Sequence, residues 1–240
     1  MEKKVLVFDV WGDFAHFRRI ETTTSPLTYP FPTGTNISGL VAAIVGLERD
    51  SYYEKFSRSD FTFGIRILNP VKKTRINLTF INTSYGYCLW DIMRKGFPPR
   101  TLIPLELVRN PKYRIFLQLE SSLVDIQEKL RKCLKKHETV FTPYLGITEL
   151  ISNFEFIGEF ESKLSKVEGE EDIHSILRID NAGIVPEEGK RYGRETVPLY
   201  MDGSRRVLEY GEVIYEFNGR SIKISKGFYC DVNGEHVVFL

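Results

Sequence analysis

The pattern of apolar and polar positions predicts a strand, a long loop and a helix at the start of the chain. A β-branched apolar run at residues 3–11 predicts a buried strand. Residues 12–32 are dense in Thr, Ser and Pro, and a loop of that length in a compact domain usually serves a function. A wide apolar face over residues 37–47 follows the candidate N-caps Thr33 and Thr35, which predicts a helix.

The next part of the chain alternates between strand-like and helix-like periodicity. Strand-like alternation is found at residues 61–68, 75–81 and 113–119. Residues 123–137 predict a helix with Ser122 as N-cap, and residues 139–148 could supply a closing strand. Its buried stripe is expected to consist of Leu123, Ile126, Leu130, Cys133 and Leu134. The first 148 residues therefore predict a ferredoxin-like βαββαβ domain within an α+β fold.

Residues 149–240 predict a small β-rich C-terminal region without a strong helix. Short strand candidates lie at residues 154–160, 206–217, 221–224 and 236–240. The dipeptides Asn218-Gly219 and Asn233-Gly234 are both hairpin signals. We therefore expect a boundary near residue 149, and the sequence contains no internal repeat.

Composition narrows the class of protein. Among 240 residues, 42% are hydrophobic, which excludes disorder and a coiled coil. The formal net charge of +1 excludes attraction of the whole molecule to nucleic acid. Charged residues are nevertheless distributed unevenly along the sequence. Residues 66–114 hold ten Lys/Arg and two acids, and residues 155–172 hold seven acids and two lysines.

Cysteine and hydropathy patterns suggest a reducing compartment. Cys88, Cys133 and Cys230 lie far apart and cannot form a disulfide framework. The longest nearly apolar stretch, residues 37–47, is much shorter than the roughly 20 residues of a membrane-spanning helix. We therefore expect a cytoplasmic protein without membrane contact.

Metal and nucleotide chemistry find little support. The histidines and cysteines are isolated, so no metal and no cofactor are expected. Residues 34–39 have the glycine spacing of a phosphate loop, but Leu40 and Val41 replace its Lys and Ser/Thr. Two interpretations stay open. The glycines serve close packing, or the helix start with Thr33, Thr35 and Asn36 holds one backbone phosphate.

Two basic clusters are weak candidates for metal-independent RNA cleavage. His16 precedes Phe17, Arg18 and Arg19, and His137 follows two lysines. A general base beside a cation can assist attack by the 2′-OH of RNA. The cluster at His137 is already explained as the end of a helix, where the dipole favours positive charge.

An aromatic and basic stretch is more informative. Its candidate RNA-binding residues are Lys72, Lys73, Arg75, Tyr85, Tyr87, Trp90, Arg94, Lys95, Phe97 and Arg100. Aromatic rings stack on bases while cations neutralise phosphates, which is the composition of a single-strand groove. The alternative is a hairpin that packs its rings on the domain and turns its cations to water.

Several N-terminal tracts together carry a family resemblance. They are Val-Phe-Asp-Val-Trp-Gly-Asp-Phe-Ala-His-Phe-Arg-Arg at residues 7–19, then residues 22–25, 29–32 and 37–47, with Tyr144-Leu145-Gly146 later. They resemble the fifth-numbered family of CRISPR-associated RAMP proteins, and the Phe-Asp-Val-Trp-Gly opening is similar to subtype I-B. The resemblance covers roughly residues 1–150.

The resemblance implies a fold and a role. It implies a ferredoxin-like domain with a β-hairpin thumb, which we place near residues 82–104. Such proteins sit at the foot of the type I surveillance complex, Cascade. There they bind the 5′ handle of the CRISPR RNA and adjoin the large subunit and a backbone RAMP subunit. The thumbs wedge between base pairs of guide and target DNA.

The resemblance also bears on catalysis. Only subtype I-C members process repeat RNA, and their Tyr-Lys-His set does not align with this chain. We therefore expect a non-catalytic RNA-binding subunit, with a metal-independent endoribonuclease and a purely protein-binding subunit as alternatives. Besides the basic stretch, the expected RNA-binding residues are Arg18, Arg19, Tyr29, Thr33, Gly34, Thr35 and Asn36.

Overall fold

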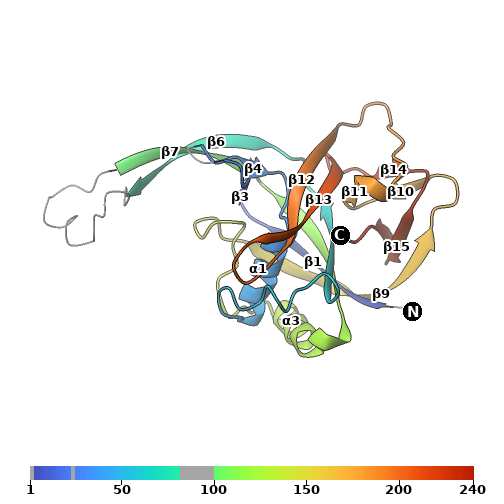
Figure 1. Cartoon of the computed structure of the whole chain (residues 1–240), viewed down its shortest axis with the longest axis horizontal. Coiled ribbons are helices and arrows are strands. Elements are labelled where there is room, and N and C mark those ends of the chain that lie inside the picture. The colour runs from blue at the N-terminus through green and yellow to red at the C-terminus, as the bar shows by residue number, and fades with distance from the viewer. Residues whose placement is uncertain (1–2, 23–24, 82–99) are drawn as a thin grey trace, which may run out of the picture.

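The computed structural model describes residues 3–22, 25–81 and 100–240 (Figure 1). The fold is mixed α/β and consists mostly of strands, with two α-helices in the part of the chain described. Among these residues, no helix is long and apolar enough to cross a membrane. The residues Tyr85, Tyr87, Trp90, Arg94, Lys95 and Phe97 lie outside the described ranges.

A six-stranded antiparallel sheet forms the centre of the molecule. Its strand order is β16-β15-β9-β1-β8-β5. The bounds are β1 (Lys3–Trp11), β5 (Phe61–Ile67), β8 (Lys112–Leu119), β9 (Asn153–Lys166), β15 (Phe228–Val232) and β16 (Glu235–Val237). The strands predicted at residues 3–11, 61–68 and 113–119 are confirmed to within a residue.

Both faces of this sheet are buried. Leu6 and Phe8 pack on the side of the helices α1 (Gly34–Val45) and α3 (Val124–Lys136), which contact each other (Figure 1). Val5 and Val7 point the other way and pack with the C-terminal strands. A strand that is buried on both faces needs a continuous apolar run, which explains the opening sequence.

The sheet curls so that its two ends approach each other. The Leu240 backbone N–H donates to the Phe63 carbonyl at 2.8 Å, although β16 and β5 are opposite edges of the sheet. At Gly64 a Cβ atom would lie 2.4 Å from the Val237 side chain, so only glycine allows this approach. The concave side is therefore closed by the C-terminal residues.

A chain of ion pairs crosses the concave side. Asp9 on β1 is 3% exposed and accepts from Arg114 Nε at 2.7 Å and from Arg114 Nη2 at 3.1 Å. Arg114 also pairs with Glu235, which binds Arg66 Nη1 at 2.7 Å. The aspartate of the N-terminal signature is therefore buried in an ion-pair network that ties β1, β5 and β8 to the first residue of β16.

The closing strand expected at residues 139–148 is wrong. The backbone N–H groups of Val140 and Phe141 donate to the carbonyls of Ile44 and Ala43 at the end of α1. Because those groups serve the helix end, the segment forms no strand, and β9 pairs with β1 instead. The sheet therefore includes strands from both sides of the boundary expected at residue 149, and that boundary stays a prediction.

Helix α3 begins later than predicted. A short 3-10 helix (Ser121–Leu123) precedes it, and Ser122 is not its N-cap, because the Ser122 hydroxyl donates to Asp60. The expected buried stripe is confirmed. Leu123, Leu130 and Leu134 are buried, and Ile126 and Cys133 pack against the core.

The C-terminal region adds two small sheets. Strand β13 (Val207–Glu216) pairs with β11 (Leu177–Arg178) and β12 (Tyr192–Met201), and β10 (Glu171–Ile173) pairs with β14 (Ile222–Ile224). The predictions at residues 206–217, 221–224 and 236–240 correspond to β13, β14 and β16. The sequence analysis missed β10, β11, β12 and β15.

Only one of the two expected hairpins forms. Asn233 and Gly234 both have positive φ, at 53° and 81°, and join the paired strands β15 and β16. The hairpin at Asn218-Gly219 is wrong, since this turn leads from β13 into a different sheet. Its fold centres on the buried Glu216 carboxylate, which accepts from the backbone N–H groups of Asn218 at 2.7 Å and Arg220 at 3.1 Å.

A second hairpin extends away from the body (Figure 1). It consists of β6 (Lys73–Ile81) and β7 (Arg100–Arg109), and β2 (Phe14–Ala15) pairs with the base of β7. The expected loop at residues 12–32 also contains the paired strands β3 (Phe17–Arg18) and β4 (Thr28–Tyr29). Leu107 is buried at the base, whereas Leu102 is 66% exposed, so β7 leaves the core with increasing distance from the base of the hairpin.

Candidate nucleic-acid interface

Glu106 on β7 makes several of the contacts that fix the hairpin to the body. Its carboxylate accepts from Lys73 Nζ at 3.0 Å and from the Thr28 backbone N–H at 3.2 Å. Its backbone carbonyl lies 2.7 Å from His16 Nδ1. Burial alone would raise the pKa of the Glu106 carboxyl group. The hydrogen bonds from Lys73 and Thr28 outweigh this effect and hold that pKa below its usual value. We call His16, Thr28, Lys73 and Glu106 the anchored base.

Several expected RNA-binding or catalytic residues belong to this base or to the core next to it. His16 is 2% exposed, and burial lowers its pKa. Tyr29 is also 2% exposed, and burial raises its pKa to about 12. Lys73 is held by Glu106 and by the Thr28 carbonyl at 2.7 Å. These side chains are occupied by contacts within the fold.

Arg18 and Arg19 are adjacent in sequence but differ in environment. Arg19 pairs with Glu195 on β12, and its guanidinium lies 5.2 Å from the centre of the Tyr29 ring. Arg18 is exposed, and its one hydrogen bond to a described residue is to the Thr22 carbonyl at 3.1 Å. Arg18 is therefore the free cation of the two.

The start of α1 is organised by its own side chains. Thr33 is the N-cap, its backbone N–H donates to Asn36 Oδ1 at 3.1 Å, and its hydroxyl lies 2.9 Å from the Thr35 hydroxyl. At Gly34 a Cβ atom would lie 2.2 Å from the Leu199 carbonyl oxygen. Close packing against Leu199 therefore explains why residue 34 is a glycine, and capping of α1 explains why residue 33 is a threonine.

Arg18, Thr35 and Asn36 are brought together in a groove of about 870 Å³ that follows α1. We call it the α1 groove. The helix contributes small residues to it, including Gly39 and Ala43. The other lining residues include Ile20, Arg49, Asp50, Tyr52, Tyr53, Phe141, Thr142, Tyr144, Thr148 and Arg205.

The sequence pointed to Arg18, but not to the aromatic residues of the α1 groove or to its other arginines, Arg49 and Arg205. Tyr144 is 42% exposed, and the rings of Tyr52 and Tyr53 lie 4.6 Å apart. Arg49 is 81% exposed at its side chain, and its Nε lies 3.7 Å from Asp50, which also accepts two hydrogen bonds from Arg205. Arg49 and the tyrosine pair follow α1 within eight residues in the sequence. This position next to the helix was the signal that could have identified them as lining the groove. Tyr144 lies in the tract quoted for the family resemblance, where no role was given to it.

The hairpin carries further cations. Lys72, Arg75 and Arg100 are exposed. Phe80 and Ile81 near the distal end of β6 are 36% and 51% exposed. The described part of the hairpin therefore presents positive charge and apolar side chains together.

Acid–base and metal chemistry are poorly supported. His137 ends α3 in a left-handed conformation, and its ring stacks on Phe154 at 4.5 Å. No group of three His, Cys, Asp or Glu side chains able to hold a metal is present among the described residues. Among the described residues, the rings of both candidate histidines, His16 and His137, therefore make contacts within the fold.

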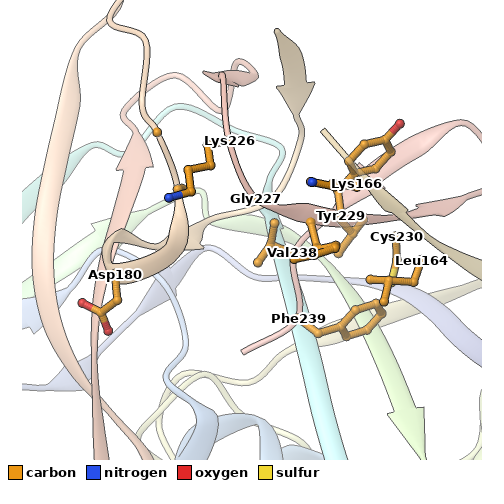
Figure 2. A pocket seen from close by; sticks show the side chains of 13 residues that line it. Leu164, Lys166, Asp180, Lys226, Gly227, Tyr229, Cys230, Val238 and Phe239 are labelled. Carbon is orange, nitrogen blue, oxygen red and sulfur yellow. The ribbon is translucent and has the colours of Figure 1, made fainter. Parts of the chain in front are cut away.

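A second, more apolar groove of about 720 Å³ is lined by residues of β9 and β15 and by the C-terminal residues 237–239 (Figure 2). Leu164, Cys230 and Phe239 line it, with Lys166 and Lys226 also among its side chains. Burial raises the pKa of the Cys230 thiol. It is lined mainly by apolar side chains and lacks the arginines of the α1 groove.

A comparison with protein-family models identifies the family. The family model described as "CRISPR-associated protein (Cas_Cas5)" matches residues 5–213. A search of curated protein sequences gave no match.

Two solved structures have similar folds. One, described as "CRISPR RNA-guided surveillance complex", is 12% identical with a TM-score of 0.56 and covers 91% of each chain. The other, a CRISPR protein from Archaeoglobus fulgidus, is 18% identical with a TM-score of 0.54 and covers 98% of each chain. On the match over most of its length, the chain belongs to the Cas5 family of CRISPR-associated proteins.

Proposed function

We propose that the chain is a non-catalytic RNA-binding subunit of a type I CRISPR surveillance complex, in antiviral defence. In this role it captures the 5′ handle of the CRISPR RNA. The observation that carries the proposal is the α1 groove, in which Arg18, Thr35 and Asn36 meet Tyr144 and Arg49. Cations for phosphates and rings for bases are the two components that single-stranded RNA requires.

The mechanism follows from the exposed groups of the groove. Arg18 and Arg49 neutralise backbone phosphates, since both side chains extend into solvent. The exposed Tyr144 ring offers a stacking surface for a base, and such stacking contributes about 1–3 kcal/mol per base. The hydroxyl of Thr35 adds a polar contact at the helix start.

The arrangement of the central strands supports a ferredoxin-like interpretation of the N-terminal part of the chain, with β9 from beyond residue 149 as the closing strand. Strands β1, β5, β8 and β9 with helices α1 and α3 follow a βαββαβ order, and the strands lie side by side as β9-β1-β8-β5. The β6–β7 hairpin, inserted between β5 and β8, is then the thumb. We place the β-rich C-terminal region at residues 149–240.

The hairpin and the body would contact different partners. In the assembled complex the exposed Arg75 and Arg100 lie along the guide RNA and target DNA, and the body joins the large subunit to a backbone RAMP subunit. Exposed apolar side chains on the hairpin, such as Leu102, suit burial in such an assembly.

The alternative is a metal-independent endoribonuclease. Burial of His16 in the anchored base argues against it, because a general base must reach the proton that it removes. Incubation of the purified chain with repeat RNA in EDTA decides between the two. Specific cleavage would establish the enzyme, and tight handle binding without cleavage supports the binding subunit.

The binding site is tested by Arg18→Ala combined with Arg49→Ala. We expect weaker binding of handle RNA, measured by fluorescence anisotropy, and a salt slope lower by up to about two, because about one counterion is released per phosphate contact. Lys163→Ala with Lys226→Ala removes the same charge elsewhere and is the control. Equal effects of the two double variants would contradict the assignment of the groove.

A further inference from the structure

The second half of α3 carries an unusual concentration of positive charge. Residues 129–136 contain five cations and no acid. We propose that the outer face of this helix binds the phosphodiester backbone of a nucleic acid duplex, at a surface separate from the α1 groove. The proposal does not depend on handle capture in that groove.

The packing of α3 turns these cations to solvent. Leu130 and Leu134 are 0% and 2% exposed and face the core. Lys129, Lys132 and Lys136 are spaced by three and four residues, which places them on one stripe of the helix. All three are exposed. We call these three residues the α3 lysine stripe.

The fold neutralises only part of this charge. Arg131 lies 3.5 Å from Glu159, and Lys136 lies 3.9 Å from Glu138. Lys135 Nζ lies 5.8 Å from the centre of the Phe156 ring. Within the described ranges, no carboxylate oxygen lies within 4.0 Å of the Lys129 or Lys132 ammonium groups. Two lysines at the middle of the helix are therefore without an ion-pair partner in the described fold.

The helix dipole does not account for the arrangement. Its favourable effect on cations falls off within the last turn, where only Lys135 and Lys136 lie. Lys132 stands three residues from Lys129 and four from Lys136, and like charges at these spacings destabilise a helix. A bound polyanion would remove that repulsion.

The chemistry of the stripe favours a nucleic acid backbone over bases or a single strand. The stripe rises about 10 Å along the helix, at about 1.5 Å per residue. A DNA duplex carries a negative charge about every 1.7 Å of its axis, so all three ammonium groups can reach phosphates. No aromatic residue occurs in residues 124–136, so the helix offers no stacking surface for an unpaired base. These features differ from those of the α1 groove.

The test is a triple variant of the full chain, Lys129→Gln, Lys132→Gln and Lys136→Gln, which removes three positive charges from the α3 lysine stripe. Glutamine keeps a polar side chain of similar reach and is a good helix former. The control is Lys163→Gln, Lys166→Gln and Lys226→Gln, which removes the same charge near the second groove. Binding of a random-sequence DNA duplex and of a single-stranded RNA of equal length is measured by fluorescence anisotropy across salt concentrations.

We expect the α3 variant, but not the control, to lose duplex affinity, with a salt slope lower by about two to three. Binding of handle RNA should be unchanged, whereas loss through Arg18→Ala and Arg49→Ala reports on the α1 groove alone. An unchanged duplex slope overturns the proposal. It is equally overturned if the α3 variant keeps duplex binding and instead fails to co-purify with an acidic protein partner. Unaltered circular dichroism and melting temperature exclude unfolding as the cause.

Discussion

The anchored base and the α1 groove each contain residues of the N-terminal signature. The side chains of the base are paired within the fold, whereas those of the groove are exposed. In the anchored base, His16 and Glu106 are satisfied by partners within the fold. In the α1 groove, Arg18 and Tyr144 are exposed. Both regions contain the charged and aromatic residue types that suggest RNA binding, so residue type alone does not separate anchoring from binding.

The difference lies in what surrounds each side chain. Arg19 meets a glutamate on a distant strand, while its neighbour Arg18 points outward, because successive residues of an extended segment alternate between faces. The base holds the hairpin and the loop in fixed positions, and the groove keeps its polar groups free for a ligand. The predictions below separate the two roles, in order of decreasing effect on stability.

The largest loss of stability is expected for Gly146→Ala, because the added methyl group would clash with the backbone of His16 in the anchored base. Gly146 has a φ of +98°, and a Cβ atom there would lie 1.8 Å from the His16 carbonyl oxygen. Backbone cannot move aside cheaply, so we expect a loss of about 4 kcal/mol or more, measured by urea unfolding. Gly169→Ala is the control. Its φ is +90° with nothing within 4 Å, so it should cost only about 1–2 kcal/mol. Similar losses at the two sites would show that the contact with His16 is unimportant.

An intermediate effect is expected for Glu106→Gln. Losing the carboxylate weakens its bonds with Lys73 and Thr28, and we expect a cost of about 1–3 kcal/mol at neutral pH. Because the folded pKa lies below the usual value, this contribution is complete above the ordinary carboxyl pKa of about 4.3 and is lost as pH falls through the lowered folded value. Denaturant melts from neutral to acid pH should show the wild type approaching the variant. A difference that does not change with pH would assign the loss to packing.

Arg19→Ala should be moderately destabilising. It leaves Glu195, whose side chain is 11% exposed, without its ion-pair partner, at a cost of about 1–3 kcal/mol. Burial already raises the pKa of Glu195. The penalty should therefore grow as pH rises through that value and vanish in acid, where Glu195 is protonated.

Arg18→Ala is the matched control for Arg19→Ala and should change stability by less than about 0.5 kcal/mol. Thermal melts of both variants, compared with their handle-RNA affinities, test the comparison directly. If Arg18→Ala were the more destabilising of the two, the distinction between anchoring and binding at this pair would be wrong.

The smallest effect on stability is expected for Tyr144→Ala, since the residue is 42% exposed and lies outside the buried core. Handle-RNA affinity should fall by about 1–3 kcal/mol if one base stacks on it. Tyr144→Phe keeps the ring and should restore most of the affinity. Equal loss in both variants would indicate that the hydroxyl, and not stacking, makes the contact.

Local patterns identified the regular elements well. The buried strand β1, the helix α1 with its Thr33 cap and the stripe of α3 followed directly from apolar periodicity and cap residues. The sequence also marked the cations of the hairpin and the N-terminal signature. It did not reveal that Lys73 and Arg19 are held by Glu106 and Glu195, because those partners are 33 and 176 residues away.

Errors arose where a distant segment competed for the same backbone groups. Residues 139–148 look like a strand, but two of their N–H groups are taken by the end of α1, so β9 closes the sheet. The α1 groove was likewise beyond local reasoning, since its walls come from residues near positions 18, 50, 144 and 205. The sequence by itself determined the family, the main strands and helices and the uneven charge, because each depends on residue identity and short-range spacing. Only the tertiary structure decided which cations are free and where a groove opens, because burial and pairing depend on segments brought together by the fold.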